Sequence, residues 1–178
     1  MKKIITFGCT FAAAGVIAFA AEETKTVITT KMVVTSSAFQ NGGKIPDKFA
    51  CKGANVSPPL HIEGVPPQAK SLAIVMDDPD APNGRFLHWL VWNIDPKTTD
   101  IAENSVPANA MQGDNGFGKA GYGGPCPPAK PHRYYFKVLA LDLDKIERIS
   151  PQSELEAKIQ SHAISYGQIM GKYSKETQ

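Results

Sequence analysis

The chain has 178 residues, of which 19 are basic and 17 acidic, so its formal charge is +2, and hydrophobic residues make up 42%. These ordinary globular values exclude a disordered tail, a coiled coil and a collagen-like repeat, and a charge near zero argues against a nucleic-acid partner. Fifteen glycines and fourteen prolines favour a β-rich fold with many turns, and the length predicts one domain.

The first twenty residues have the pattern of a bacterial secretory signal peptide. Two lysines precede an apolar, uncharged stretch from residue 4 to residue 20, which ends in the small-x-small sequence Ala-Phe-Ala. We expect a signal peptide at 1–20, with cleavage after Ala20 or Ala21, and a single domain at 21–178. The alternative is an uncleaved anchor, but the stretch is short for a membrane span. The protein is therefore expected to be periplasmic or secreted, with no integral membrane segment after cleavage.

Two cysteines remain in the mature chain, Cys51 and Cys126, because Cys9 lies within the predicted signal. An even pair in an exported protein indicates a disulfide. Both residues lie in loops rich in glycine and proline, so the bond would join loops and not core elements. Two separate buried thiols are the alternative.

Runs of β-branched or apolar residues predict strands at 26–36, 60–62, 71–76, 88–94 and 133–141, with a last short strand near 167–173. One helix is predicted after them in the 150s. Ser150 can cap it, Pro151 suits its first position, and Leu155, Ile159 and Ala163 fall on one stripe. The fold class is therefore mainly β, with one or two short helices.

An acidic motif, Asp77-Asp78-Pro79-Asp80-Ala81-Pro82, directly follows the strand predicted at 71–76. Three carboxylates in four positions repel one another, so the fold must stabilise at least one of them. The prolines restrict the preceding residues to extended backbone, which fixes the carboxylate directions at a strand end, where functional sites often lie. A rigid turn with solvated charges is the alternative interpretation.

Two histidines begin strands, His88 beside Trp89 and His132 in the sequence Pro-His-Arg-Tyr. The loop 112–131 before His132 has about 20 residues, a length typical of functional or disordered loops. Its Gly123-Gly124-Pro125 stretch permits close backbone approach, and backbone N–H groups there can form an anion nest. Imidazoles, N–H donors and a tyrosine hydroxyl together suit a small oxyanion, and an aspartate close by would orient a histidine or hold an amine on the ligand. Purely structural histidines are the alternative.

The same loop contains a match to the dinucleotide fingerprint G-x-G-x-x-G at 116–121. That fingerprint requires a strand before it and a helix after it. The residues that follow, Tyr-Gly-Gly-Pro-Cys-Pro-Pro, cannot continue a helix, so we do not expect nucleotide binding through this motif.

Four segments resemble the phosphatidylethanolamine-binding protein (PEBP) family, and most of all its bacterial branch often labelled Raf-kinase-inhibitor-like. They are CKGANVSPPL at 51–60, DPDAP at 78–82, HWLVWNI at 88–94 and GGPCPPAKPHRYYFKVLALD at 123–142. The resemblance implies a β-sandwich with a central antiparallel sheet and a pocket for phosphate-like anions, including phospholipid head groups.

The resemblance also implies roles for individual residues. Arg133 is expected to be structural, pairing with an aspartate of the acidic motif, and Lys130 stands where the family's G-x-H-R motif has glycine. The residues that match the family's pocket, and are expected to bind the ligand, are Asp78, Asp80, His88, Gly124, Pro125, His132 and Tyr134.

These observations predict an exported, non-enzymatic binding protein with a small pocket for phosphate-like anions or phosphorylated head groups. No nucleophile stands in a G-x-S-x-G or H-E-x-x-H motif, so no catalytic residue, cofactor or metal is predicted. An inhibitor or interaction protein acting on an envelope or host protein is the main alternative, and a hydrolase is a third. Bacterial members of the family can pair, so a homodimer stays open.

Overall fold

The computed structural model describes residues 30–175. The predicted signal peptide and residues 26–29 of the first predicted strand lie outside the described residues. Within the described range, no helix is both long and apolar enough to cross a membrane.

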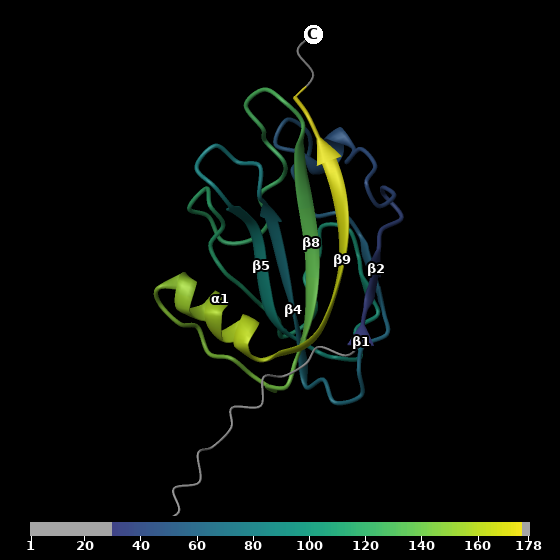
Figure 1. Cartoon of the computed structure of the whole chain (residues 1–178), viewed down its shortest axis with the longest axis vertical. Coiled ribbons are helices and arrows are strands. Elements are labelled where there is room, and N and C mark those ends of the chain that lie inside the picture. Colours follow the sequence, from purple (N-terminus) through teal and green to yellow (C-terminus); the bar gives the residue numbers. More distant parts are fainter. Residues whose placement is uncertain (1–29, 176–178) are drawn as a thin grey trace, which may run out of the picture.

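Two β-sheets make up most of the fold (Figure 1). The larger has the order β1 (Thr30–Lys31), β9 (Ala163–Tyr173), β8 (His132–Leu141), β4 (Ser71–Asp78), β5 (Phe86–Ile94) and β7 (Met111–Gln112). The smaller has the order β2 (Val33–Thr35), β3 (Leu60–Glu63) and β6 (Asp100–Ile101). Neighbouring strands are antiparallel except for the parallel pair β1–β9. The predicted fold class, mainly β, is confirmed.

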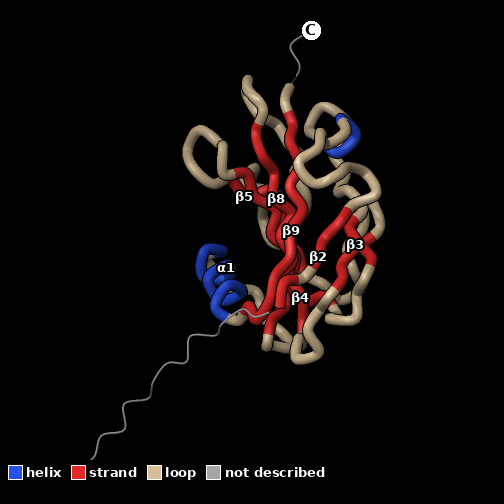
Figure 2. Tube along the Cα trace, turned by 45° about the vertical axis from the view of Figure 1, so that its right-hand side comes forward, coloured by secondary structure: helices blue, strands red, loops and turns tan. Residues whose placement is uncertain are grey.

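The large sheet is the middle layer, with α1 (Gln152–Ser161) on one side and the small sheet on the other (Figure 2). Strand β4 is buried at all eight positions because both of its faces are covered. Leu72, Ile74 and Met76 belong to the core shared with the small sheet, whereas Ala73 and Val75 pack in the core under α1. Alternate side chains of the one strand thus pack in two different cores.

The central strands confirm the sequence prediction, but β4 extends two residues further than expected. Asp77 and Asp78 therefore lie within the strand, and the acidic motif does not begin after it. The strand can continue because each carboxylate has a partner. Asp77 accepts hydrogen bonds from Arg85 and Lys137, and Asp78 accepts one from His132.

The helix begins one residue later than predicted and ends earlier. Pro151, with extended backbone, occupies the N-cap position, and no side chain caps the helix, so the capping role of Ser150 is not realised. Leu155 and Ile159 are buried as expected, but Ala163 is the first residue of β9. Ala163 still packs in the same core as the two helical residues.

The first predicted strand, 26–36, is divided at Met32 in the part that the structure describes. Residues before Met32 pair with β9 of the large sheet, and residues after it pair with β3 of the small sheet. The Met32 N–H still donates to the carbonyl oxygen of Tyr166, so the chain leaves one sheet only as it joins the other.

Candidate functional site

A cavity of about 240 Å³ opens at one end of the large sheet, where β4 ends and β5 and β8 begin. Asp78, His88, His132 and Tyr134 come from these three strands, whereas most of the other lining residues, including the polar Asn83 and Arg85, come from loops. The lining consists of Asp78, Ala81, Pro82, Asn83, Gly84, Arg85, Phe86, His88, Phe117, Cys126, Pro127, Pro128, His132 and Tyr134. The fold therefore brings together four of the predicted ligand-binding residues: Asp78, His88, His132 and Tyr134.

A buried aspartate–histidine pair lies in this cavity. The Nδ1–H of His132 donates to Oδ2 of Asp78 at 2.7 Å, and each side chain is only 3–4% exposed. A carboxylate at this distance fixes the ring orientation and leaves Nε2 as the ring nitrogen that is free to meet a ligand. The pair thus supplies one oriented imidazole.

His88 reaches the cavity because of a β-bulge. Met76 pairs with Trp89 and Asp77 pairs with Leu87, so His88 is the extra residue with no partner opposite it on β4. Bulges redirect a side chain out of the strict alternation of the strand. Here the His88 ring meets the Tyr134 ring edge to face, with centroids 5.2 Å apart. Without the bulge, alternation from Trp89 would turn His88 towards α1.

Burial and one hydrogen bond determine the protonation state and the tautomer of the His88 ring. Its Nδ1–H donates to the carbonyl oxygen of Gly123 at 2.6 Å, because a carbonyl oxygen can only accept. Burial lowers the pKa of His88 below its ordinary value, despite the opposing effects of this hydrogen bond and of the Asp78 charge. The neutral ring therefore carries its lone pair on Nε2.

The ring of Tyr134 packs against the rings of both histidines. Its ring stacks near His132 at 6.4 Å between centroids, and its buried hydroxyl makes no hydrogen bond of standard geometry within the described residues. Burial, and after it the negative charge of Asp78, raises the pKa of Tyr134 well above its ordinary range. The tyrosine is thus a neutral side chain that packs against the imidazoles.

Asp80 lies outside this cavity and is fully engaged by Arg133. The backbone N–H and Nε–H of Arg133 donate to Oδ2 at 2.9 and 2.8 Å, and Nη2 donates to Oδ1 at 2.6 Å. These hydrogen bonds hold the pKa of Asp80 below its usual range. The structural pairing expected of Arg133 is present, whereas the carboxylate of Asp80 faces its partner and not the cavity.

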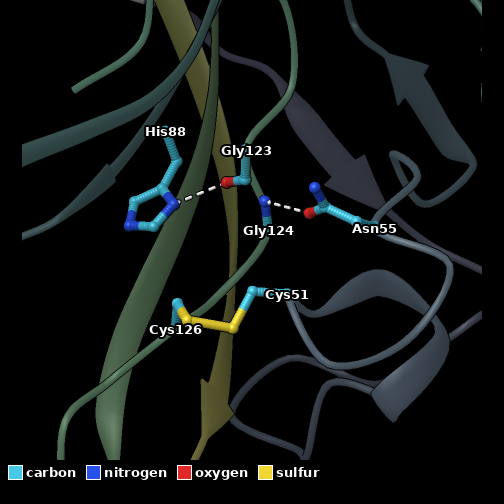
Figure 3. The surroundings of a disulfide bond; sticks show 6 residues. All are labelled: Cys51, Asn55, His88, Gly123, Gly124 and Cys126. Carbon is cyan, nitrogen blue, oxygen red and sulfur yellow. Dashed lines mark hydrogen bonds between the residues drawn. A yellow bond between two sulfur atoms is a disulfide. The ribbon is translucent and has the colours of Figure 1, made fainter. Parts of the chain in front are cut away.

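Gly124 and Pro125 are not among the residues that line the cavity. Figure 3 shows Gly124 with its N–H directed at the side chain of Asn55. The Gly123 N–H donates to the carbonyl oxygen of His88, and the Gly124 N–H donates to Oδ1 of Asn55 at 2.7 Å. Their N–H groups are therefore used within the protein, and the expected anion nest does not form at these glycines. A Cβ on Gly124 would overlap the carbonyl oxygen of Phe49, so close packing explains this glycine.

A disulfide joins Cys51 to Cys126 beside these glycines (Figure 3). The Cys51 N–H also donates to the carbonyl oxygen of Pro125. The bond links two loops, as predicted, and one of them continues into Pro127 and Pro128 of the cavity wall. The wall is thus tied to a loop 75 residues away in the sequence.

The loop 112–131 is organised by Asn115. Its Oδ1 accepts the Phe117 N–H, its Nδ2 donates to the carbonyl oxygen of Gly121, and its own N–H donates to Lys119. The G-x-G-x-x-G match therefore forms turns closed by a bridge between Asp114 and Ala120, with no helix after it.

Asp77 is on the opposite face of the large sheet from Asp78. Its Oδ2 accepts from Nε of Arg85 at 2.6 Å and from Nζ of Lys137 at 3.0 Å, and Arg85 continues to Glu156 on α1. Neighbouring carboxylates in one strand thus take separate tasks: Asp77 ties the sheet to the helix, and Asp78 holds His132.

Comparison with known proteins adds a decisive observation. Residues 35–174 match the sequence model of the family described as phosphatidylethanolamine-binding protein. The chain belongs to the PEBP family.

Relatives and solved structures agree with this assignment. A UPF0098 protein of Archaeoglobus fulgidus is 46% identical over 171 residues, covering 92% of this chain and 58% of that protein, so the chain spans little more than half of that relative. The UPF0098 protein PH1269 of Pyrococcus horikoshii is 44% identical over 151 residues, covering 79% and 76%.

The PEBP fold is also shown by crystal structures. Escherichia coli YbcL, described as a member of the mammalian PEBP family, superimposes with a TM-score of 0.77 at 34% identity and covers 82% of this chain and 99% of YbcL. CT736 of Chlamydia trachomatis superimposes with a TM-score of 0.75 at 40% identity over the same shares.

Two aromatic residues of this PEBP cavity were missed by reasoning from the sequence. Phe86 and Phe117 pack edge to face at 4.8 Å, and each lies against His88, at 4.9 and 5.6 Å between centroids. Phe117 is 47% exposed at the cavity rim. For Phe117, an aromatic side chain inside a stretch of glycines was the available signal.

Among residues 30–175, no group of three metal-binding side chains comes together.

Proposed function

We propose that this PEBP-family protein binds a small phosphate-like anion or phosphorylated head group in the cavity that His88 and His132 share. The observation that carries the proposal is the pair of buried imidazoles, each held at Nδ1 by the protein, beside an otherwise largely apolar wall. Such a site offers two ring nitrogens to a phosphoryl group and an apolar surface to whatever the group is attached to.

Because the His88 ring is neutral, binding a phosphoryl group is expected to involve one extra proton, carried either by the ligand or by the ring. Neutral His88 presents a lone pair at Nε2, which accepts a hydrogen bond from a protonated phosphoryl oxygen. Alternatively, the bound anion raises the pKa of His88 and the ring becomes a charged donor. Affinity for a phosphate monoester should therefore rise as the pH falls towards 6.

Binding without turnover is the second part of the proposal. The residues that line the cavity include no serine or threonine, and the sulfur of Cys126 is in the disulfide. A site with oriented imidazoles but without such a nucleophile suits holding a phosphorylated group more than transferring it.

Export is the third part. The apolar segment after two lysines and the disulfide between Cys51 and Cys126 both fit an oxidising compartment. Mass spectrometry of the protein from a periplasmic extract is expected to give an N-terminus at Ala21 or Glu22. An intact Met1 on protein from the cytoplasmic fraction would contradict export.

Calorimetric titration with phosphate, phosphoethanolamine and a nucleotide tests the binding function. We expect saturable binding, and a roughly 10- to 100-fold weaker affinity for His132→Ala, since one charge-assisted hydrogen bond is lost. His162→Ala is the matched control because His162 also donates from Nδ1 to an aspartate, Asp142, at 2.8 Å on the surface. Equal loss of affinity in both variants, or no binding, would reject the proposal. Steady release of p-nitrophenol from its phosphate ester, abolished by His132→Ala, would reject the non-enzymatic part.

Phe117 favours a second candidate function, the engagement of a protein partner at the cavity rim. An aromatic side chain 47% exposed at a loop tip is typical of an interface residue. A partner captured from an envelope extract and retained by the His88→Ala/His132→Ala variant, but lost by Phe117→Asp, would support this function over anion binding.

A further inference from the structure

A second hollow shares His132 with the proposed anion cavity. It has a volume of about 510 Å³ and is lined by Asp80, Lys130, Pro131, His132, Arg133 and Lys172. His132 is the one residue that lines both hollows within the described part of the chain. A ligand that contacts His132 from the cavity is therefore adjacent to this second space.

The second hollow has an excess of positive charge. Lys130, Arg133 and Lys172 face the single carboxylate of Asp80, so its formal charge is +2. Asp80 gives both of its oxygens to Arg133, so it is not free to neutralise the lysines. In the part of the chain that the structure describes, the side chains of Lys130 and Lys172 take part in no ion pair or hydrogen bond.

Strand register concentrates these cations. Arg133 on β8 is the register partner of Lys172 on β9. The backbone of Lys172 also forms an isolated β-bridge with that of Lys44. Like charges directly opposite each other on neighbouring strands destabilise a sheet. Asp80 already balances the charge of Arg133, so an anion placed here would be attracted chiefly by Lys130 and Lys172.

We infer that this hollow is a subsite for a second anionic group, so the ligand class that the protein prefers carries two anionic groups. One is the phosphoryl group at His88 and His132, and the other is a phosphate or carboxylate held by Lys130, Lys172 and Arg133. The inference rests on the proposed function, because it takes the first group to lie in the cavity.

Calorimetry with a matched pair of probes tests this inference. n-Propyl phosphate carries one phosphate, and propane-1,3-diyl bisphosphate adds a second on the same chain; bisphosphates with spacers of two to six methylenes cover the span. At low salt we expect the best bisphosphate to bind about tenfold more tightly than the monophosphate. This advantage should shrink as salt is raised to about 0.3 M, because the lysines are exposed and screened.

Substitution of the two lysines separates the subsite from the cavity. Lys130→Gln/Lys172→Gln should abolish the advantage of the bisphosphate while changing the affinity for propyl phosphate less than about twofold. Lys97→Gln is the control, since Lys97 is exposed in the turn after β5, beyond the far end of that strand. The inference is overturned if no bisphosphate exceeds the monophosphate, or if the double variant weakens both probes equally.

The outcomes also distinguish this inference from the proposed function. If propyl phosphate binds and depends on His132 but no bisphosphate gains affinity, the cavity stands and the subsite falls. If only the bisphosphate binds, through Lys130 and Lys172 and without dependence on His88, the hollow binds an anion by itself, and both the proposed function and the two-group inference are rejected. If neither probe binds, both are rejected.

Discussion

The disulfide between Cys51 and Cys126 should contribute a large share of the stability of this protein. It closes a loop with a sequence separation of 75 residues. On the chain-entropy model, a cross-link of that span removes about 15 cal/mol/K from the unfolded ensemble, equivalent to about 4.5 kcal/mol at 25 °C. Both cysteines are exposed, so replacing them with serine adds little cost of its own.

Urea unfolding of Cys51→Ser/Cys126→Ser, followed by the fluorescence of the buried Trp89 and Trp92, measures this contribution. The free energy of unfolding should fall by about 4.5 kcal/mol, and the m-value should rise because the unfolded chain is no longer cross-linked. The wild type unfolded with a reductant present should give the same curve as the variant. A loss below about 1 kcal/mol with an unchanged m-value would refute the reasoning that the bond acts on the unfolded chain.

Three further changes have definite expected outcomes. Because burial lowers the pKa of His88, the unfolded chain takes up a proton below about pH 6.5 that the native ring does not. Stability should therefore fall as the pH drops from 7 to 5, and His88→Asn should flatten that slope in thermal melts; an unchanged slope would show that other groups set it. Gly124→Ala should lower the free energy of unfolding by about 1–3 kcal/mol, because its Cβ would overlap the Phe49 carbonyl oxygen, and a neutral effect in urea would contradict the packing. Asp77→Asn should cost about 1–2 kcal/mol in urea unfolding, since it removes the charge that holds the half-exposed Arg85; an unchanged free energy of unfolding would contradict this role of Asp77.

The core strands were predictable because their patterns are local. The runs at 71–76 and 133–141 are apolar on both faces, as expected of strands covered by two layers, and they became β4 and β8. The family motifs also identified Asp78, His88 and His132, which the fold brings to one cavity. Each of these inferences depends on residues close together in the sequence.

The features that were missed depend on what lies opposite a residue in space. His88 faces the cavity only because β4 pairs around it, and a second irregularity near Asn93, whose φ is +61°, disturbs the alternation of β5 again. Gly124 matched a pocket loop, but its neighbours Asn55 and Phe49 lie some 70 residues earlier in the sequence. No period in the sequence encodes such contacts.

The bulge at His88 divides strand β5 into two parts with different packing partners. From Trp89 to Trp92, side chains alternate between the two cores, so any change there must satisfy the packing of both layers. Before the bulge, the strand is out of phase with that pattern, and Phe86 and His88 line the cavity. The bulge therefore lets a single strand supply both the double-sided core and the wall of the cavity, while Leu87, between Phe86 and His88, still packs in the core under α1.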